Sequence, residues 1–232
     1  MIERLDKFLA SAGLGSRSDV KLLLKKGLVT INGEIIKRPE QKINTEKDTV
    51  TYQGNVMSNQ KLFYYMLHKP VGYVSAKIDN TAPTVISLLK EDVREDLFPV
   101  GRLDKDTEGL LLITNDGALS HRLLSPKYHV EKTYLVTIPQ KLVLEQIQAL
   151  EEGVDIGDES ITRPAKVTVL EERQIHLTIT EGRFHQVKRM LHAVGSEVLY
   201  LKRVSFGTLK LDETLPLGEY RALTEEEVKT LC

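Results

Sequence analysis

The sequence predicts an α+β protein of two domains: a small N-terminal domain of two helices and a hairpin, then a larger domain in which helices flank a mainly antiparallel mixed sheet. Its 232 residues exceed one typical domain and fall short of two full-sized ones. Apolar residues make up 41% and charged residues 28%, enough for a sizeable core. From Phe63 onward, strand-like and helix-like segments are interspersed, with many strands arranged as hairpins. We place the domains at residues 1–58 and 61–232.

Composition excludes several classes of protein. No stretch approaches the ~18 consecutive apolar residues that a transmembrane helix needs, and the N-terminus carries acidic residues without an apolar signal-peptide run. We therefore expect a cytoplasmic protein with no membrane association. The only cysteine, Cys232, is the last residue, so disulfide frameworks and cysteine-rich metal sites are not expected.

Charge is distributed unevenly along the chain. The net charge of −1 argues against a nucleic-acid-binding protein. Residues 1–42, however, hold nine Lys or Arg against five acidic residues, so the N-terminal region is basic and the remainder mildly acidic. Contacts to a phosphate backbone depend on local rather than total charge.

The elements of the first domain follow from apolar periodicity and from cap and turn signals. Leu5, Phe8, Leu9 and Ala12 form one helix face. Ser16 and Asp19 fit a capping box, and Asn32-Gly33 is a strong two-residue hairpin signal. In chain order we predict a helix over 2–13, a helix from Ser16 to Gly27, a hairpin over 29–36, a strand over 48–52 and a linker over 54–60.

The basic residues of this domain allow two interpretations. They could simply solvate one face, which is usual for charged helix residues. Arg17, Lys21 and Lys25 recur at helical spacing, however, and Lys37-Arg38 ends the hairpin, so the charges could converge on one surface.

The segment RLDKFLASAGLGSRSDVKLLLKKGLVTINGEIIK, residues 4–37, resembles the S4 RNA-binding domain over almost the whole length of that domain. The resemblance implies a phosphate-contacting surface on the second helix and the hairpin. Such contacts are salt-sensitive and carry little sequence information. The candidate RNA-binding residues are Arg4, Arg17, Ser18, Lys25, Lys26 and Lys37.

The larger domain alternates short strands and helices, which favours an α+β fold with a mainly antiparallel sheet. We predict strands over residues 62–67, 110–114, 132–138, 165–169, 175–179 and 197–206, and helical segments over 85–89, 118–124, 142–150 and 185–194.

A charged loop, Gly101 to Leu110, precedes the apolar strand 110–114. We expect its carboxylates at an edge of the sheet, held by a rigid element yet open to a ligand. Asp104 lies between Arg102 and Lys105, and cationic neighbours favour the ionised form that a nucleophile or base requires. The loop could also be a solvated turn with surface ion pairs worth about 0–1 kcal/mol each.

Four segments resemble pseudouridine synthases and occur in that family's order. GRLDKDTEGLLLITNDG places Asp104, next to Arg102, on the catalytic aspartate. KTYLV places Tyr134 on the tyrosine that stacks on the target base, and EGRFHQVKRML places Lys188 on the basic partner of the aspartate. VLYLKRVSFG places Leu201 and Arg203 on the C-terminal motif that lines the pocket. With the S4-like segment, the resemblance covers nearly the whole chain.

Two segments of the larger domain resemble the bacterial synthases that modify small-subunit ribosomal RNA. Large-subunit relatives usually carry Asn-Arg where this chain has Phe184-His185, and the segment LPLGEYRALTEEE is also similar to the small-subunit enzyme. The resemblance implies a monomeric isomerase that acts on 16S ribosomal RNA, free or in assembly intermediates, with uridine 516 as its target. A 23S ribosomal RNA synthase and a non-catalytic S4-type assembly factor remain alternatives.

The reaction that the resemblance implies breaks the bond between ribose C1′ and uracil N1 and rejoins the base through C5. It involves no redox step or group transfer, so we expect no cofactor. The uridine must leave its stack, which costs a few kcal/mol, and stacking on Tyr134 recovers about 1–3 kcal/mol. Asp104 could add to uracil C6, attack C1′ or abstract a ribose proton, and the sequence does not choose among these routes.

Two other chemistries are conceivable for the larger domain. His185 and His192 could share a helix face, but no third metal ligand stands in an obvious motif, so we expect no metal site. Asp104 and Glu108 could form the paired carboxylates of a nucleoside or glycan hydrolase. The absence of tryptophan and an aromatic content of 6% argue against a sugar-binding platform.

Overall fold

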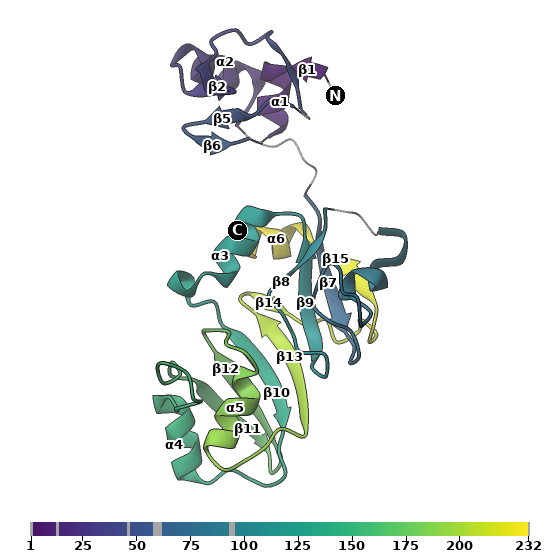
Figure 1. The fold of residues 1–232 in the computed structure, drawn as a ribbon, viewed down its shortest axis with the longest axis vertical. Helices are drawn as coiled ribbons and strands as arrows, with labels where there is room; N and C mark the ends of the chain where they lie inside the picture. Colours follow the sequence, from purple (N-terminus) through teal and green to yellow (C-terminus); the bar gives the residue numbers. More distant parts are fainter. Residues whose placement is uncertain (1, 13, 46, 58–61, 93–95, 232) are drawn as a thin grey trace. The chain divides into compact units, whose positions relative to one another are not determined.

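The computed structural model describes residues 2–12, 14–45, 47–57, 62–92 and 96–231 (Figure 1). The chain divides into two compact units, residues 1–61 and 62–232. The domain limits predicted at 58 and 61 fall on residues outside the described part. Within the described residues, no helix is both long enough and apolar enough to cross a membrane.

The first unit is built from two helices and short antiparallel strands. The helices pack on strands that carry Val29, Ile43 and Val50, and the helix residues Leu5, Leu9 and Leu24 are fully buried in this core. The strands form a β1-β4 pair and a sheet in the order β3-β2-β5-β6. Its elements are β1 (Ile2–Arg4), α1 (Leu5–Ser11), α2 (Arg17–Lys25), β2 (Val29–Ile31), β3 (Glu34–Ile35), β4 (Lys42–Asn44), β5 (Val50–Tyr52) and β6 (Asn55–Val56).

Local signals in this unit predicted its helices and its hairpin. Ser16 and Asp19 form the reciprocal capping box that begins α2. Asn32 and Gly33 both have positive φ, at 52° and 90°, which a tight hairpin turn of this kind requires.

Two expectations for this unit were wrong in detail. The first helix begins at Leu5 rather than at residue 2, because Ile2–Arg4 pairs with β4 as a strand. The linker predicted from residue 54 begins instead with β6, which pairs with β5. Residues 58–60 of that linker lie outside the described part.

The described residues of the second unit form a nine-stranded sheet with helices on both faces. The main strand order is β11-β12-β10-β13-β9-β7-β15, with β14 paired to β13 and β8 paired to β9. The sheet is antiparallel except where β13 runs parallel to β9, which confirms the predicted mainly antiparallel α+β fold.

The strands of this unit are β7 (Tyr64–Lys69), β8 (Phe98–Val100), β9 (Glu108–Thr114), β10 (Lys132–Thr137), β11 (Lys166–Glu171), β12 (Gln174–Ile179), β13 (Tyr200–Phe206), β14 (Leu209–Lys210) and β15 (Tyr220–Ala222). The helices are α3 (Gly117–Leu124), α4 (Leu144–Glu152), α5 (Gln186–Ala193) and α6 (Glu225–Leu231), with 3₁₀ segments η1 (Val85–Asp92) and η2 (Pro126–Tyr128).

The alternation of side chains along the strands separates two cores. In β9, Leu111 and Ile113 face one core, which also holds residues of η1, α4 and α5. Leu110 and Leu112 face the other, which α3 and α6 cover. Figure 1 shows α5 lying over β10 and β12, so the two helix layers cover opposite faces of the sheet.

Five elements of the second unit were not predicted: β8, η2, β14, β15 and α6. Of these, β15 returns the chain to β7, and its Arg221 donates to Asp212 at 2.7 Å and to Glu227 of α6 at 2.9 Å. The segment that carries β15 and α6 was cited only for its similarity to the small-subunit enzyme, because no apolar run marks it as strand or helix.

Candidate functional site

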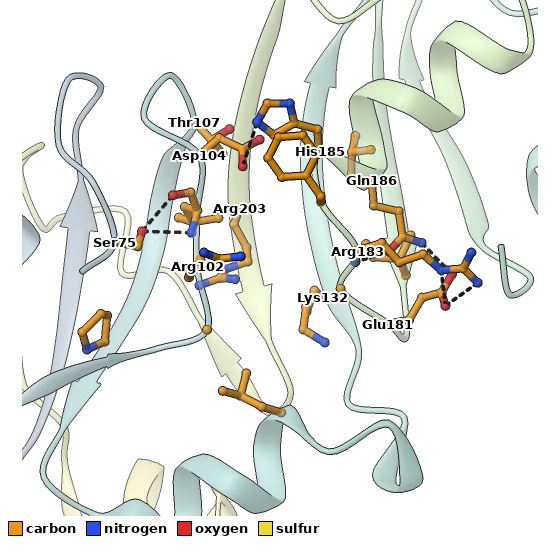
Figure 2. Close-up of a pocket in the computed structure, with 18 of the residues that line it drawn as sticks. Ser75, Arg102, Asp104, Thr107, Lys132, Glu181, Arg183, His185, Gln186 and Arg203 are labelled. Atoms are coloured by element: carbon orange, nitrogen blue, oxygen red, sulfur yellow. Dashed lines mark hydrogen bonds and ion pairs between the residues drawn. The ribbon is translucent and has the colours of Figure 1, made fainter. Parts of the chain in front are cut away.

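A cleft of about 980 Å³ lies in the second unit, along the face of the sheet that carries α5 (Figure 2). Its walls come from the loop before β9, from β10 and β13, and from the segment that leads into α5. All six residues predicted for the active site line this cleft: Arg102, Asp104, Tyr134, Lys188, Leu201 and Arg203.

The loop that carries Asp104 begins at a positive-φ glycine, Gly101, and continues directly into β9. β9 is an internal strand of the sheet, between β7 and β13. The loop therefore extends from the end of a central strand, and the expected position at a sheet edge was wrong. An internal strand is held on both sides, which makes it a firmer support for a reactive group.

A buried lysine holds this loop in place through hydrogen bonds to its backbone. The Lys69 side chain is fully buried, and its ammonium donates to the carbonyl oxygens of Pro70 (3.0 Å), Asp104 (3.0 Å) and Thr107 (2.8 Å). Burial lowers the pKa of Lys69 to about 8, against the opposing influence of three nearby carboxylates, those of Asp104, Asp106 and Glu108. Lys69 thus binds the backbone on both sides of the loop's acidic segment.

Two further contacts hold the same loop. The Ser75 hydroxyl donates to the Leu103 carbonyl at 2.8 Å and accepts from the Leu103 amide at 3.0 Å. The Gly72 amide donates to the Lys105 carbonyl at 2.7 Å. Since backbone groups on both sides of Asp104 are bonded to the segment after β7, the backbone of the loop is held in place around Asp104.

Of the three carboxylates in this loop, Asp104 is the one that lines the cleft. Its side chain is 28% exposed, whereas that of Asp106 is 72% exposed. Glu108 accepts a hydrogen bond of 2.6 Å from the Tyr200 hydroxyl. The arrangement disfavours the paired-carboxylate chemistry of a hydrolase, because Glu108 does not share the cleft with Asp104.

Lys188 joins α5 to the acidic loop. Its ammonium lies 3.4 Å from Asp104 Oδ2 and donates to Asp106 Oδ1 at 2.5 Å. The Lys188 hydrogen bond holds the pKa of Asp106 below its usual value. His185, which precedes α5, places Nε2 3.7 Å from the other Asp104 oxygen, as Figure 2 shows. Lys188 therefore lies close enough to Asp104 for the predicted pairing of the two side chains.

Strand alternation brings the remaining predicted residues to one face. Tyr134 of β10 lies directly across from Arg203 of β13, and Val136 lies across from Leu201. Tyr134 is largely buried, its ring borders the cleft, and its hydroxyl has no hydrogen bond with any described residue. A base that entered the cleft would meet the Tyr134 ring and the apolar Leu201 side chain together.

Arg203 is 1% exposed, and only some of the hydrogen-bond donors of its guanidinium have partners among the described residues. Its Nε donates to the Leu110 carbonyl at 2.8 Å, and its guanidinium lies 5.0 Å from the Phe206 ring. Nη2 is buried and has no hydrogen-bond partner among the described residues. An unpaired buried donor is unfavourable, and this one belongs to a residue that lines the cleft, so a ligand oxygen would satisfy it.

Gly109 allows β9 and β13 to meet beside the loop. The parallel pairing between them is short, Lys202 opposite Glu108 and Arg203 opposite Gly109. Gly109 has φ of 108°, and a Cβ there would lie 2.2 Å from the Arg203 carbonyl oxygen. Only glycine fits this approach, so one residue of the loop's motif also determines where Arg203 lies.

Sequence reasoning missed three residues that shape the cleft: Lys69, Ser75 and Lys132. Lys132 is buried, donates to the Val130 carbonyl at 2.9 Å and lines the cleft. Burial, helped by the neighbouring Arg203, lowers the pKa of Lys132 to about 8. Alternation could have indicated Lys132, because it lies two positions before Tyr134 and on the same strand face.

Arg102 was predicted beside Asp104 as a supporting cation. Its side chain lines the cleft, as Figure 2 shows, and it has no hydrogen bond or ion pair with any described residue. The side chains that adjoin the Asp104 carboxylate are instead Lys188 of α5 and His185, which precedes that helix.

The candidate RNA-binding residues of the first unit lie at two places. Arg4 forms a bidentate pair with the buried Asp6, which holds the pKa of Asp6 below its usual value, and the charge of Arg17 acts in the same direction. Arg17 and Ser18 are exposed on the first turn of α2. Exposed residues also surround the end of that helix, where Lys37 packs beside Gly27, next to Lys25 and Lys26.

The metal interpretation of His185 and His192 gains no support. Among the residues that the structure describes, no group of three or more His, Cys, Asp or Glu side chains could hold a metal ion.

Comparisons with known proteins agree with this geometry. Residues 63–193 match the RNA pseudouridylate synthase family, and residues 3–50 match the S4 domain. The chain is 48% identical to the uncharacterized RNA pseudouridine synthase YtzG of Bacillus subtilis (strain 168), covering 98% of each chain. It is 44% identical to ribosomal small subunit pseudouridine synthase A of Escherichia coli (strain K12), covering 98% of this chain and 99% of that protein.

A solved structure is similar over the same extent. A crystal structure of a pseudouridylate synthase shares 40% identity and a TM-score of 0.72, covering 99% of both chains. The four motifs, the cleft on which they converge and these matches give one conclusion: the chain is an isomerase of the RNA pseudouridylate synthase family that carries an N-terminal S4 domain.

Proposed function

We propose that this protein converts a uridine of 16S ribosomal RNA to pseudouridine, with Asp104 as the catalytic residue. The observation that carries the proposal is the convergence of Asp104, Tyr134, Lys188 and Arg203 on one cleft. Relatives of 42–48% identity include several named ribosomal small subunit pseudouridine synthase A, which supports a small-subunit substrate. The proposed target is uridine 516 of that RNA.

In this proposal the target uridine leaves its stack and enters the cleft. Its base stacks against Tyr134 while Asp104 acts on the sugar or the base, either by addition to C6, by attack at C1′ or by abstraction of a ribose proton. Lys188 orients the carboxylate and balances its charge. Leu201 provides an apolar wall for the detached uracil, and Arg203 Nη2 donates to an oxygen of the substrate.

The first unit would supply affinity for the RNA backbone through Arg4, Arg17, Ser18, Lys25, Lys26 and Lys37. We propose that the enzyme acts as a monomer in the cytoplasm. We also propose that it needs no cofactor or metal ion, because the isomerisation neither consumes nor releases a group or an electron.

A pair of matched substitutions in one loop tests the catalytic assignment. Asp104→Asn and Asp106→Asn each remove one negative charge that adjoins Lys188, but only Asp104 lines the cleft. We expect Asp104→Asn to bind RNA and form no detectable pseudouridine, a loss of at least about 10⁴-fold for a catalytic group that nothing replaces. Asp106→Asn should retain activity within about tenfold, because it affects only the position of Lys188.

The measurement is chemical mapping of pseudouridine in small-subunit RNA, offered both naked and as assembly intermediates. Modification at a position other than 516 would correct the target and leave the chemistry intact. Equal activity of wild type and Asp104→Asn would remove Asp104 from the reaction. A wild-type protein that binds both substrates and modifies neither would instead support a non-catalytic assembly factor.

A further inference from the structure

We infer that Phe184, stacked on His185, forms a second base-binding subsite at the cleft, for the nucleobase that adjoins the extruded uridine. The inference rests on the proposed function and deepens it. The centroids of the two rings lie 3.8 Å apart with an interplanar angle of 19°. Phe184 is 68% exposed although both residues line the cleft. One face of its ring is thus covered by His185 and the other is free.

The subsite lies next to the reacting group. His185 Nε2 is 3.7 Å from Asp104 Oδ1, and Figure 2 shows the His185 ring facing this carboxylate. An extruded uridine stays covalently linked to the nucleotides on either side of it. A base that neighbours a uridine held at Asp104 is therefore within reach of a ring that stacks on His185.

Backbone contacts hold the aromatic pair in this position. His185 has a left-handed φ of 48°, which turns the chain sharply before α5. Arg189 Nη1 donates to the Phe184 carbonyl at 3.0 Å, and the Arg189 amide donates to the His185 carbonyl at 3.0 Å. Arg189 is itself fixed by Asp158 at 2.5 Å. A preorganised ring loses little entropy when a ligand stacks on it.

The charges of the cleft identify the ligand as part of a nucleic acid. Its lining includes seven Lys or Arg residues and three carboxylates: Lys77, Arg102, Lys105, Lys132, Arg183, Lys188 and Arg203 against Asp79, Asp104 and Glu181. An aromatic platform beside a cationic groove is the usual means of binding single-stranded nucleic acid. When the target uridine leaves the stack, its neighbour loses a stacking partner, and Phe184 would replace it.

The test uses Phe184→Leu, with Phe184→Tyr as an aromatic rescue and Leu144→Ala as a control. Leu144 is similarly exposed, at 64%, but lies on α4 and does not line the cleft. Each is placed in the Asp104→Asn background, where bound RNA is not turned over. The RNA carries 2-aminopurine on one or the other side of the uridine mapped with wild type, because stacking quenches the fluorescence of this base.

We expect Phe184→Leu to increase the fluorescence at one of the two flanking positions and to weaken RNA binding roughly 5-fold or more. Phe184→Tyr should restore both values, and Leu144→Ala should change neither. With Asp104 intact, Phe184→Leu should raise KM and leave kcat within about twofold, because Phe184 does not touch the reacting atoms.

Unchanged fluorescence at both flanking positions in Phe184→Leu, with unchanged affinity, would overturn the inference. A fall in kcat at constant KM would also overturn it, because that result assigns Phe184 to the chemistry. Either result is distinct from failure of the proposed function, in which wild type itself forms no pseudouridine.

Discussion

Lys69 places an ammonium beneath the loop that carries Asp104, where a hydrophobic residue would be the usual occupant. Its three hydrogen bonds to carbonyl oxygens compensate for burial, and two of these oxygens belong to the loop itself, at Asp104 and Thr107. The residue is therefore a positioning group for the carboxylate rather than a participant in the reaction. It also makes stability depend on pH in a direction that can be calculated.

We predict that the stabilisation contributed by Lys69 grows as pH rises. Burial lowers its pKa to about 8 from 10.5, so between these values the unfolded chain binds more protons at this position than the folded one. The free energy of unfolding then increases with pH across that window, by at most about 3 kcal/mol. The Lys69→Met variant has no titrating group at this position. The free energy of unfolding of wild type minus that of the variant, measured by urea denaturation, should therefore rise from pH 7 to 9.5.

Lys132, whose pKa is also lowered to about 8, is present in both proteins and cancels in the comparison. The variant should also lose at least about tenfold in activity, because three carbonyl oxygens lose their donor and the loop is no longer held. A stability difference that is constant or falls with pH would show that Lys69 is not buried as a charged group at neutral pH.

Residues with a motif could be located from the sequence, and residues without one could not. Asp104, Tyr134 and Lys188 stand in recognisable segments, and all three line the cleft. Lys69 follows the strand predicted over residues 62–67 and was assigned no role, because the bonds that define its role reach 35 and 38 positions along the chain. Long-range contacts of this kind leave no local pattern.

At the scale of elements, the junction of β9 and β13 is the feature on which the cleft depends. It joins the strand that follows the Asp104 loop to the strand that carries Leu201 and Arg203. It is the parallel contact in an otherwise antiparallel sheet, and it spans two residue pairs. A small displacement here would separate Arg203 from Asp104 without unfolding either half of the sheet.

We predict that Gly109→Ala destabilises the protein by more than about 4 kcal/mol or prevents folding. The added Cβ would meet the Arg203 backbone at 2.2 Å, in addition to the strain of φ at 108°. Gly195→Ala is the matched control, because Gly195 also has positive φ, 74°, but a Cβ there meets nothing within 4 Å. That variant should lose only about 1–2 kcal/mol. Urea denaturation of both proteins measures the difference, and similar losses would mean that the strands can separate to admit the methyl group.

The elements that the sequence predicted are those with local causes. The capping box of α2 and the Asn32-Gly33 turn depend on neighbouring residues, and both form as expected. β1, β4, β14 and β15 are two or three residues long. Such strands exist only through pairing with a partner, as β15 does with β7 more than 150 positions earlier. Neither periodicity nor propensity can reveal them.

At the scale of the whole molecule, the two units differ in charge and in the part of the substrate that each would contact. The first unit carries the excess of Lys and Arg, while the rest of the chain is mildly acidic apart from the cations of the cleft. In the proposed function, backbone contacts would supply affinity that does not depend on sequence, and the cleft would select one uridine. Affinity and turnover should therefore respond to different substitutions.

We predict that Lys25→Glu together with Lys26→Glu weakens RNA binding and flattens its salt dependence. These exposed residues end α2 beside Lys37, where a phosphate contact would release counterions. Each lost contact lowers the slope of log K against log salt by about 0.7–0.9, so the double variant should lose roughly 1.4–1.8 in slope.

Lys42→Glu with Lys47→Glu makes the same change of charge at exposed positions of this unit outside the candidate set. Binding titrations from 50 to 300 mM salt should separate the two pairs, and at saturating RNA both should retain the wild-type kcat. Equal slopes for both pairs would mean that total charge, rather than a surface at the end of α2, attracts the RNA.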